Sequence, residues 1–242
     1  MRKVLILASL VALALTAGAC SSKKETVSSN DIKTHGIYAA IDVIGTSTGN
    51  VTVRAELKVG GEDSNTHVIL DNGDKITATG GTETKTLTAS SEGLYEAQFS
   101  GSELDTAYKI DFQRPSDTSA PNSNGKIPGP FEISALPTTK PSRANDDLVI
   151  KWTPSEAKDD IYIYVKGDCI YDYENTKITQ DPGTFTIPKG TLKSTGEKDG
   201  EPNDCSLKVT VIKIRPGSLD PAFGSGYVHL QQRREATFVS AQ

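Results

Sequence analysis

The sequence predicts an all-β protein with two antiparallel β-sandwich domains. Three observations support this fold class. Apolar and polar residues alternate with a period of two in several segments, as they do in strands with one buried face. The chain contains 21 Gly and 12 Pro, which favour turns between strands. No window carries an apolar stripe of helical period and helix length, so we expect little helix.

The first residues are typical of a secretory signal peptide. Met1-Arg2-Lys3 is cationic, residues 4–15 are apolar except Ser9, and small residues follow as far as Ala19. The apolar run of about twelve residues is shorter than the ~20 that a membrane-spanning helix needs. We therefore predict that residues 1–19 are a signal peptide and that the mature protein is exported.

Cys20 follows the small residues directly, and the segment resembles the lipobox of bacterial lipoproteins. This resemblance implies cleavage before Cys20 and a membrane anchor of diacylglycerol and palmitate on that cysteine, which would hold the protein stably because it has more than one chain. Ser21 in place of Asp implies the outer membrane of the cell envelope if the host is Gram-negative. Ala17 stands where lipoboxes usually have Leu. Ala17-Gly18-Ala19 also fits ordinary signal peptidase, which would release a soluble protein.

The lipidated cysteine and the polar residues after it, 20–33, are predicted to form a flexible tether. The first sandwich is predicted over 34–114. Its clearest strand is Val51–Val59, where the odd-numbered residues are apolar. Asn72-Gly73 predicts a hairpin turn between strands at 67–70 and 75–78.

Two further strands of this domain show the same alternation. Leu94–Ser100 places Tyr95, Ala97 and Phe99 on one side, and Ala107–Gln113 does so with Tyr108, Ile110 and Phe112. Residues 115–130 contain four prolines and few apolar residues. Because proline lacks the backbone donor, we expect this stretch to be an interdomain linker that joins no sheet.

The second sandwich is predicted over 131–242. Leu148, Ile150 and Trp152 share one face, and Pro154 follows. This segment resembles the B strand of fibronectin type III domains, and Ile161–Val165 would be the next strand, so the resemblance implies an immunoglobulin-like fold. Later strands are expected at 184–187, 205–214, 226–231 and 236–240. The apolar face changes parity at Ile212, which predicts a β-bulge or a crossing between sheets.

The remaining cysteines, Cys169 and Cys205, form an even pair once Cys20 is acylated. An extracytoplasmic location favours a disulfide between them. Closing a loop of this length would stabilise the protein by roughly 3–4 kcal/mol in the chain-entropy model. The anchor prediction therefore involves all three cysteines.

The sequence contains no recognisable catalytic or metal-binding motif, and we predict no enzyme activity and no cofactor. His35, His67 and His229 have no spaced partners, and acidic pairs such as Asp146-Asp147 lack a full calcium ligand string. The net charge is −5, and it becomes −7 when Arg2 and Lys3 are removed with the signal peptide. This balance argues against nucleic acid as a partner.

Four tyrosines provide the candidate binding surface. Tyr162, Tyr164, Tyr171 and Tyr173 fall within twelve residues, and the alternation of residues 161–165 places Tyr162 and Tyr164 on the outer face of their strand. Tyrosine suits contact with a sugar or a protein because it combines a large apolar area with a polar tip. Ordinary packing between strands would also explain these residues.

These observations favour a non-enzymatic, lipid-anchored envelope protein whose β-sandwich modules bind a protein or glycan. The alternative is a structural accessory subunit of an envelope complex, with the sandwiches serving only as a spacer.

Overall fold

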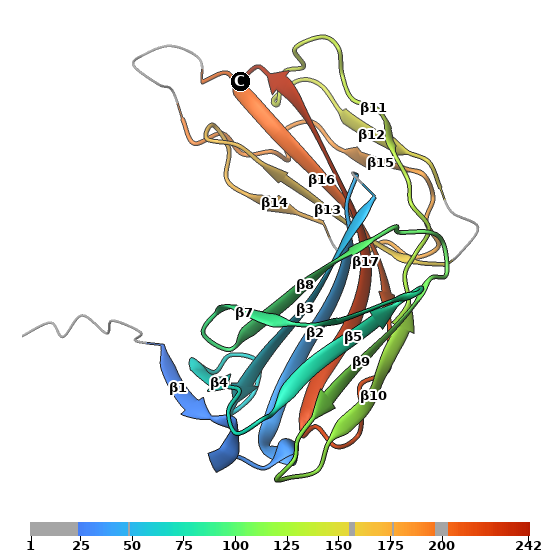
Figure 1. The fold of residues 1–242 in the computed structure, drawn as a ribbon. Helices are drawn as coiled ribbons and strands as arrows, with labels where there is room; N and C mark the ends of the chain where they lie inside the picture. The colour runs from blue at the N-terminus through green and yellow to red at the C-terminus, as the bar shows by residue number, and fades with distance from the viewer. Residues whose placement is uncertain (1–23, 48, 155–157, 176, 197–202) are drawn as a thin grey trace, which may run out of the picture.

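The computed structural model describes residues 24–47, 49–154, 158–175, 177–196 and 203–242. The predicted signal peptide and Cys20 lie outside these ranges. The described strands form three sheets, and two of these pack against different parts of the third (Figure 1). The predicted all-β sandwich fold is confirmed. Apart from strands, the described residues contain two single-turn 3-10 helices, Ser29–Asp31 (η1) and Thr34–Gly36 (η2).

The largest sheet, called the large sheet below, contains ten strands among the described residues and runs through the whole molecule. Its longest strand, β17, pairs in parallel with β2 and antiparallel with β16. The strands, in order across the sheet, are β1 (Glu25–Ser28), β4 (Thr66–Ile69), β3 (Asn50–Val59), β2 (Ile37–Gly45), β17 (Ser225–Ser240), β16 (Cys205–Pro216), β13 (Asp160–Lys166) and β14 (Tyr173–Glu174), with β8 (Leu94–Ser100) on β3 and β7 (Thr88–Ser91) on β8.

Two smaller sheets cover the large sheet and enclose two separate hydrophobic cores. The second sheet covers β2, β3 and β8, and the third sheet covers β13 and β16. The second sheet consists of β10 (Ala120–Lys126), β9 (Ala107–Gln113), β5 (Lys75–Gly80) and β6 (Glu83–Thr86), and the third of β11 (Ile133–Ala135), β12 (Leu148–Trp152) and β15 (Thr184–Ile187). The result is two sandwiches that share one continuous sheet.

Strands that were predicted from alternation have the expected buried faces. Val51, Val53, Ala55 and Leu57 of β3 are buried in the first core. The same holds for the aromatic faces of β8 and β9, except that Ala97 is only partly buried. In the second core, Leu148, Ile150 and Trp152 are buried on β12, and Ile161, Ile163 and Val165 on β13. Period-two patterning therefore identified both the strands and their inward faces.

The predicted hairpin at Asn72-Gly73 is wrong, although the turn itself forms. Asn72 and Gly73 have φ values of 51° and 84°, and the N–H of Asp74 donates to the carbonyl of Asp71 at 2.9 Å. The strands on either side belong to different sheets, however, since β4 pairs with β3 and β5 pairs with β9. The turn therefore carries the chain across the first core, so that residues on β4 and β5 pack face to face.

The predicted tether is wrong from residue 25 onward, because this segment is part of the first sandwich. β1 pairs in parallel with β4. Arg114 holds the segment that follows: its Nη1 donates to the carbonyl of Ile32 at 3.0 Å, and its Nη2 donates to the carbonyl of Ser29. Arg114 is itself paired with Asp74 at 2.9 Å, and both side chains are almost fully buried. The polar composition of this segment suggested that it was flexible. It gave no sign that the buried guanidinium of Arg114 binds the backbone carbonyls of the segment.

The prediction that residues 115–130 join no sheet is also wrong. Ala120–Lys126 forms β10, which pairs with β9 at the edge of the second sheet. The register is irregular between Ala120 and Ser123, where Pro121 lies, and the irregularity accommodates the missing donor. Ala120 and Ser123 are fully buried, so this polar stretch contributes to the interior.

The C-terminal residues depart from prediction in two ways. The expected strands at 226–231 and 236–240 are one continuous strand, β17, and its Val228 and Leu230 belong to the first core while Phe238 belongs to the second. The division of the chain at residue 131 must therefore be corrected, because β17 contributes to both sandwiches. Neither the predicted bulge nor the alternative crossing between sheets occurs in the described residues of β16, which stays in the large sheet with a regular register to β13 and β17. The apolar parity changes at Ile212 because a buried lysine, Lys213, takes the next inward position.

A polar seam separates the two cores where β16 and β17 pass between the sandwiches. Gln232 is fully buried and donates to the carbonyls of Ser102 and Pro128 at 3.0 and 3.1 Å. Arg215 pairs with Asp105 of the first sandwich at 2.6 Å and with Asp159 of the second at 2.8 Å. These contacts link the two halves through side chains as well as through the sheet.

The predicted disulfide between Cys169 and Cys205 is confirmed. It joins the loop after β13 to the first residue of β16, across a sequence separation of 36 residues. Cys169 is fully buried in the second core. The bridge therefore holds the loop after β13 and the start of β16 together at that core.

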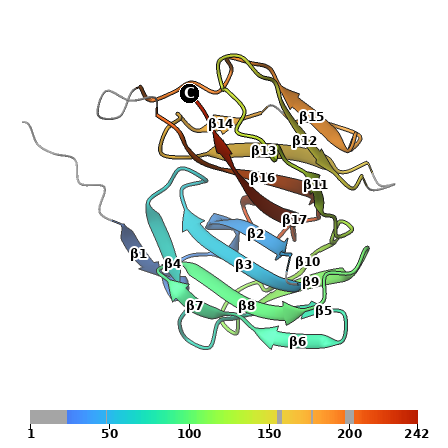
Figure 2. The same ribbon diagram turned by 90° about the horizontal axis from the view of Figure 1, so that it is seen from above.

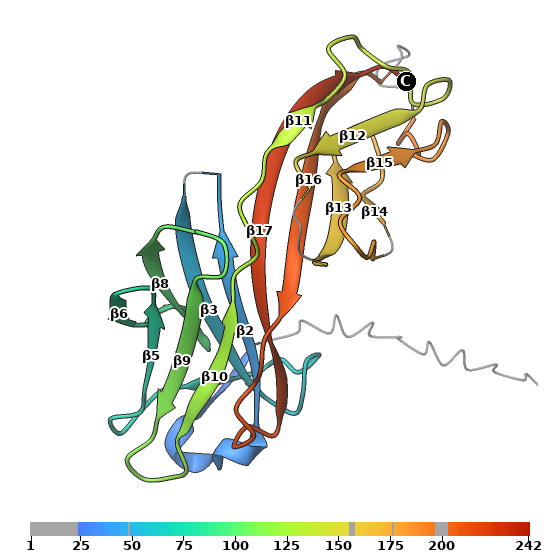
Figure 3. The ribbon, with the colours of Figure 1, turned by 90° about the vertical axis from the view of Figure 1, so that its right-hand side faces the viewer.

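The large sheet bends strongly as it passes from one sandwich to the other. In Figures 1 and 2 its two ends, β1 and β14, lie on the same side of β17, so that the sheet is C-shaped in section. Figure 3 shows β17 running through both sandwiches, and in Figures 1 and 2 the second and third sheets lie on the outside of the bend. The face that these sheets leave uncovered lies inside the bend and is called the concave face below.

A buried ion pair in the second sandwich provides a test of this packing. Lys213 Nζ lies 2.7 Å from Asp181, both side chains are fully buried, and Trp152 Nε1 donates to Asp181 at 2.6 Å. Removing one partner leaves a buried charge uncompensated. We expect Lys213→Met and Asp181→Asn each to lower the free energy of unfolding by about 3–5 kcal/mol in chemical denaturation.

The exposed pair of Lys166 and Asp172, 2.7 Å apart, supplies the matched control. Lys166→Met should cost less than about 1 kcal/mol, because solvent-exposed ion pairs contribute little. If both Lys213→Met and Asp181→Asn cost less than about 1 kcal/mol, Lys213 and Asp181 do not form a buried ion pair that stabilises the second sandwich.

Candidate functional site

The concave face is the candidate site because it is a polar and aromatic surface shared by both sandwiches. Its residues follow from strand parity: the even-numbered residues of β17 point into the first core, so the odd-numbered ones point to the opposite side. The register of the neighbouring strands extends this face in both directions. Its central residues are Tyr38, Asp42, Tyr162, Tyr164, Ile212, Tyr227, His229, Gln231 and Arg233.

An aromatic group occupies the part of the concave face formed by β2 and β17. The rings of Tyr227 and His229 are stacked with centroids 4.1 Å apart, and Tyr38 meets Tyr227 edge-on at 6.5 Å. Burial raises the pKa of Tyr227, and the nearby Asp42 carboxylate raises it further. Burial is also the main cause of the raised pKa of Tyr38, with Glu62 as the next contribution. Both phenols therefore remain neutral donors at physiological pH.

Asp42 lies beside this aromatic group. It accepts a hydrogen bond from Gln231 Nε2 at 2.7 Å, and the hydroxyl of Tyr227 lies 3.5 Å from its other oxygen. Burial raises the pKa of Asp42, although the charges of His229 and Arg54 and the Gln231 hydrogen bond act in the opposite direction. The net effect is a carboxylate that is less well solvated than an ordinary surface aspartate.

A hollow of about 300 Å³ lies farther along the concave face, over β13, β16 and β17. This volume is at the lower end of the range of roughly 300–1,000 Å³ for small-molecule sites. Tyr164 on β13 and Arg233 on β17 line the hollow from the two strands that flank β16. On β16, Ile212 pairs with Arg233 and Thr210 pairs with Tyr164, so Tyr164 and Arg233 are diagonal neighbours across the hollow. The Tyr164 hydroxyl donates to Glu174 at 3.0 Å, which fixes the orientation of the ring.

The four predicted tyrosines do not share one surface. Tyr162 and Tyr164 both lie on the concave face, next to Ile212 and Thr210 in the register. Tyr173 pairs with Val165 and packs against the second core, on the other side of the sheet. Tyr171 is 65% exposed and lies in the loop before β14. A binding role for Tyr162 and Tyr164 stays a prediction.

Sequence reasoning missed the contribution of β17 to this face. Tyr227, His229, Gln231 and Arg233 alternate with Val228 and Leu230, so a period-two pattern was present. The prediction divided the strand near residue 232, because Gln232 and Arg234 break the apolar alternation on its other side. The position of Asp42 and Tyr38 next to β17 had no sequence signal, since the two strands are about 185 residues apart.

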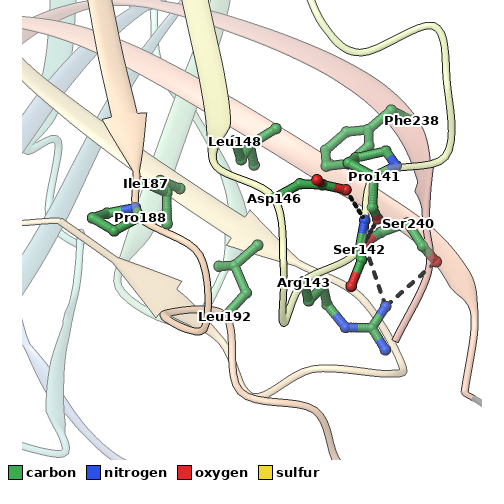
Figure 4. Close-up of a pocket in the computed structure, with 10 residues that line it drawn as sticks. All are labelled: Pro141, Ser142, Arg143, Asp146, Leu148, Ile187, Pro188, Leu192, Phe238 and Ser240. Atoms are coloured by element: carbon green, nitrogen blue, oxygen red, sulfur yellow. Dashed lines mark hydrogen bonds between the residues drawn. The ribbon is translucent and has the colours of Figure 1, made fainter.

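Two other hollows are less suited to a ligand. The cavity beside Arg143, at the far end of the second sandwich, has a volume of about 10 Å³ (Figure 4). That is room for about one water molecule. A wide depression of about 530 Å³ lies on the second sheet, but its one aromatic residue, Tyr108, is buried in the first core. Neither hollow combines an accessible ring with an unpaired charge.

Among the described residues, no three His, Cys, Asp or Glu side chains are grouped so that they could hold a metal ion. The described residues also include no helix with the length and apolar character needed to cross a bilayer. Of the three histidines, His67 lies 3.8 Å from Glu56, His229 stacks on Tyr227, and His35 is exposed.

Two solved structures are distantly similar to the chain. No protein-family model and no curated protein sequence matches the chain. A structure of the FN1–FN3 domains of chicken CNTN1 is similar with a TM-score of 0.31 and 9% identity, over 90% of this chain and 68% of that one. The adhesin InvE of Yersinia pseudotuberculosis is similar with a TM-score of 0.24 and 13% identity, over 83% of this chain; the match spans 58% of InvE.

The environment of Asp42 predicts a pH-dependent cost in stability. Because its folded-state pKa is raised, its contribution to stability is fully present below the ordinary pKa of about 3.9 and is lost as the pH rises through the folded value. We expect Asp42→Asn to match the wild type in free energy of unfolding at pH 3 and to equal or exceed it at pH 7. Urea denaturation at both pH values measures this difference.

Asp172→Asn is the control for Asp42→Asn, because the side chain of Asp172 is 64% exposed. It should show no comparable gain between pH 3 and pH 7. An Asp42→Asn protein that is clearly less stable than the wild type at pH 7 would contradict our account of this carboxylate.

Proposed function

We propose that the protein is a non-enzymatic, lipid-anchored component of the cell envelope that binds a partner through its concave face. The observation that carries the proposal is the concave face itself, where Tyr162 and Tyr164 of one sandwich and Tyr227 and His229 of the other lie on a single uncovered sheet surface. Aromatic residues are enriched at binding surfaces because they provide large contact areas with few rotatable bonds. The partner is a protein or a glycan.

The position of the first described strand bears on how such an anchor would act. β1 begins at Glu25, five residues after Cys20. A chain of five residues spans at most about 18 Å when fully extended. An acyl group on Cys20 would therefore keep the first sandwich close to the membrane, with much less freedom than a tether of residues 20–33 would give.

The alternative role, as a structural subunit of an envelope complex, is favoured by the rigid connection between the sandwiches. Arg215 bridges Asp105 and Asp159, and β17 is continuous between the two cores. A rigid body of this kind could act as a spacer. Crosslinking in cells followed by pull-down separates the two roles, because a stable complex of fixed stoichiometry would support the subunit.

The anchor is tested by mass spectrometry of the mature N-terminus from native cells. We expect a chain that begins at Cys20 and carries the mass of diacylglycerol and palmitate, since the lipobox resemblance implies both. In a Cys20→Ala strain the acyl mass should be absent and the protein should leave the membrane fraction. An unmodified wild-type N-terminus, at Cys20 or elsewhere, would overturn the anchor.

The binding face is tested by the double substitution Tyr162→Ala and Tyr164→Ala. Truncating aromatic residues that contact a partner typically costs about 1–2 kcal/mol each, so partner recovery in the pull-down should fall at least tenfold. Tyr171→Ala is the matched control, because Tyr171 is exposed and lies outside the strands, in the loop before β14, where its N–H donates to the carbonyl of Lys193 at 3.0 Å. Full recovery of every partner with the double variant would show that these tyrosines are not the binding surface.

A further inference from the structure

The hollow over β13, β16 and β17 has chemistry that narrows the class of ligand, on the assumption that the concave face is the binding surface proposed above. Its lining includes three cationic side chains, Lys166, Lys208 and Arg233, and one acidic one, Glu235. This balance is opposite in sign to the net charge of the whole chain. Asp172 lies against Lys166 and Glu174 against Tyr164, and these carboxylates offset part of the positive charge, so the attraction for a negatively charged ligand is centred on Arg233.

The three cations differ in how they are compensated. Lys166 pairs with Asp172 at 2.7 Å and Lys208 with Glu235 at 3.5 Å, but all four side chains are about half exposed or more, so these pairs are weak and exchangeable. Arg233 has no carboxylate within ion-pair distance among the described residues. Its Nε is buried and lacks a hydrogen-bond partner in the described part of the chain. Its Nη2 donates to Gln231 Oε1 at 3.4 Å, which leaves the second donor of Nη2 and both donors of Nη1 for a ligand. A planar guanidinium with these free donors suits a carboxylate, which can accept one hydrogen bond from each Nη.

The apolar part of the hollow lies next to this guanidinium. Ile212 is 6% exposed and pairs directly with Arg233 in the register. Tyr164, two strands away, is held by its hydrogen bond to Glu174. A ring fixed at its hydroxyl offers a face on which the apolar side of a ring-shaped ligand can stack, while its polar edge remains in water.

The backbone around the hollow argues against an extended peptide as the ligand. β16 pairs with β13 on one side and with β17 on the other over the residues that line the hollow. Its N–H and C=O groups are therefore used within the sheet, and a peptide could not add as a further strand at this place. Recognition must come from side chains, which suits a ligand that presents hydroxyls, a carboxylate and ring faces.

We propose that this hollow binds a carboxylate-bearing saccharide, with the carboxylate on Arg233 and a sugar ring over Tyr164 and Ile212. Lys166 and Lys208 contribute longer-range attraction at the rim. The ligand class is an acidic glycan of the uronate type, and the contact is made by side chains that three neighbouring strands hold in fixed positions.

The test is isothermal titration calorimetry of the full mature chain in detergent with a galacturonate hexamer. A neutral galactose hexamer and a glutamate hexamer serve as comparison probes. We expect the galacturonate hexamer to bind, with an affinity that falls as salt is added, and the other two to bind at least tenfold more weakly. Arg233→Gln should weaken galacturonate binding about tenfold or more, because it removes a charge-assisted hydrogen bond.

Lys109→Gln is the matched control, because Lys109 is an exposed cation on the second sheet and lines the wide depression there. Its affinity for the galacturonate hexamer should equal that of the wild type. If Arg233→Gln fails to fold, as judged by its thermal unfolding, Lys208→Gln takes its place and should weaken binding by a smaller factor.

Several outcomes would overturn the proposal. These are no binding of the galacturonate hexamer, equal binding of the neutral hexamer, equal or tighter binding of the glutamate hexamer, and unchanged affinity in a folded Arg233→Gln protein. The proposed function is judged separately by the pull-down with the Tyr162→Ala and Tyr164→Ala variant. If that variant loses its partner while no acidic saccharide binds, only the ligand class proposed here is wrong.

Discussion

The backbone pairing of β17 on both of its edges is the constraint on which the architecture depends. Residues 229–232 pair with β2 on one side and with β16 on the other, so the hydrogen-bonded ladder never breaks between the sandwiches. Two domains joined by a linker could rotate relative to each other, whereas two cores on one sheet cannot do so without breaking strand pairing. The concave face is therefore one surface of fixed shape, and residues from both sandwiches can act on the same ligand.

β17 contributes to both cores, and the side chains that point inward between the two cores are polar. Gln232 and Lys213 are fully buried at this point, and each is bonded: Gln232 to two carbonyls, and Lys213 to Asp181 and the carbonyl of Thr153. Buried polar groups with partners cost little, whereas the same groups without partners would destabilise the junction. Such groups also fix the register, because a one-residue slip of β17 would place Gln232 on the concave face and Arg233 in the interior.

The sequence predicts local features of this fold well and long-range ones poorly. Alternation identified β3, β8, β9, β12 and β13 with the correct inward faces, because parity depends only on neighbouring residues. It also placed Tyr162 and Tyr164 opposite the core. Strand partners depend on residues far apart in the chain, so neither the parallel pairing of β17 with β2 nor the route of the turn at Asn72-Gly73 was predictable. Composition misled for β10 and for the segment after β1, where Arg114 supplies partners that a local window does not contain.

Some charged residues of the concave face are not the ones that would make the folded protein most stable. Burial raises the pKa of Asp42, so its charge weakens the folded state at neutral pH, and Arg233 leaves a buried donor unused in the described structure. A sheet surface optimised for folding alone would carry exposed, mutually paired charges at these positions, as the pair of Lys177 with Asp160 does. Proteins retain such costs mainly where a function needs them. The hollow and the aromatic group on β2 and β17 are also coupled electrostatically, because the charge of Arg233 is among those that lower the pKa of Asp42. A ligand that binds Arg233 would therefore also change the electrostatic environment of Asp42 and of the aromatic group beside it.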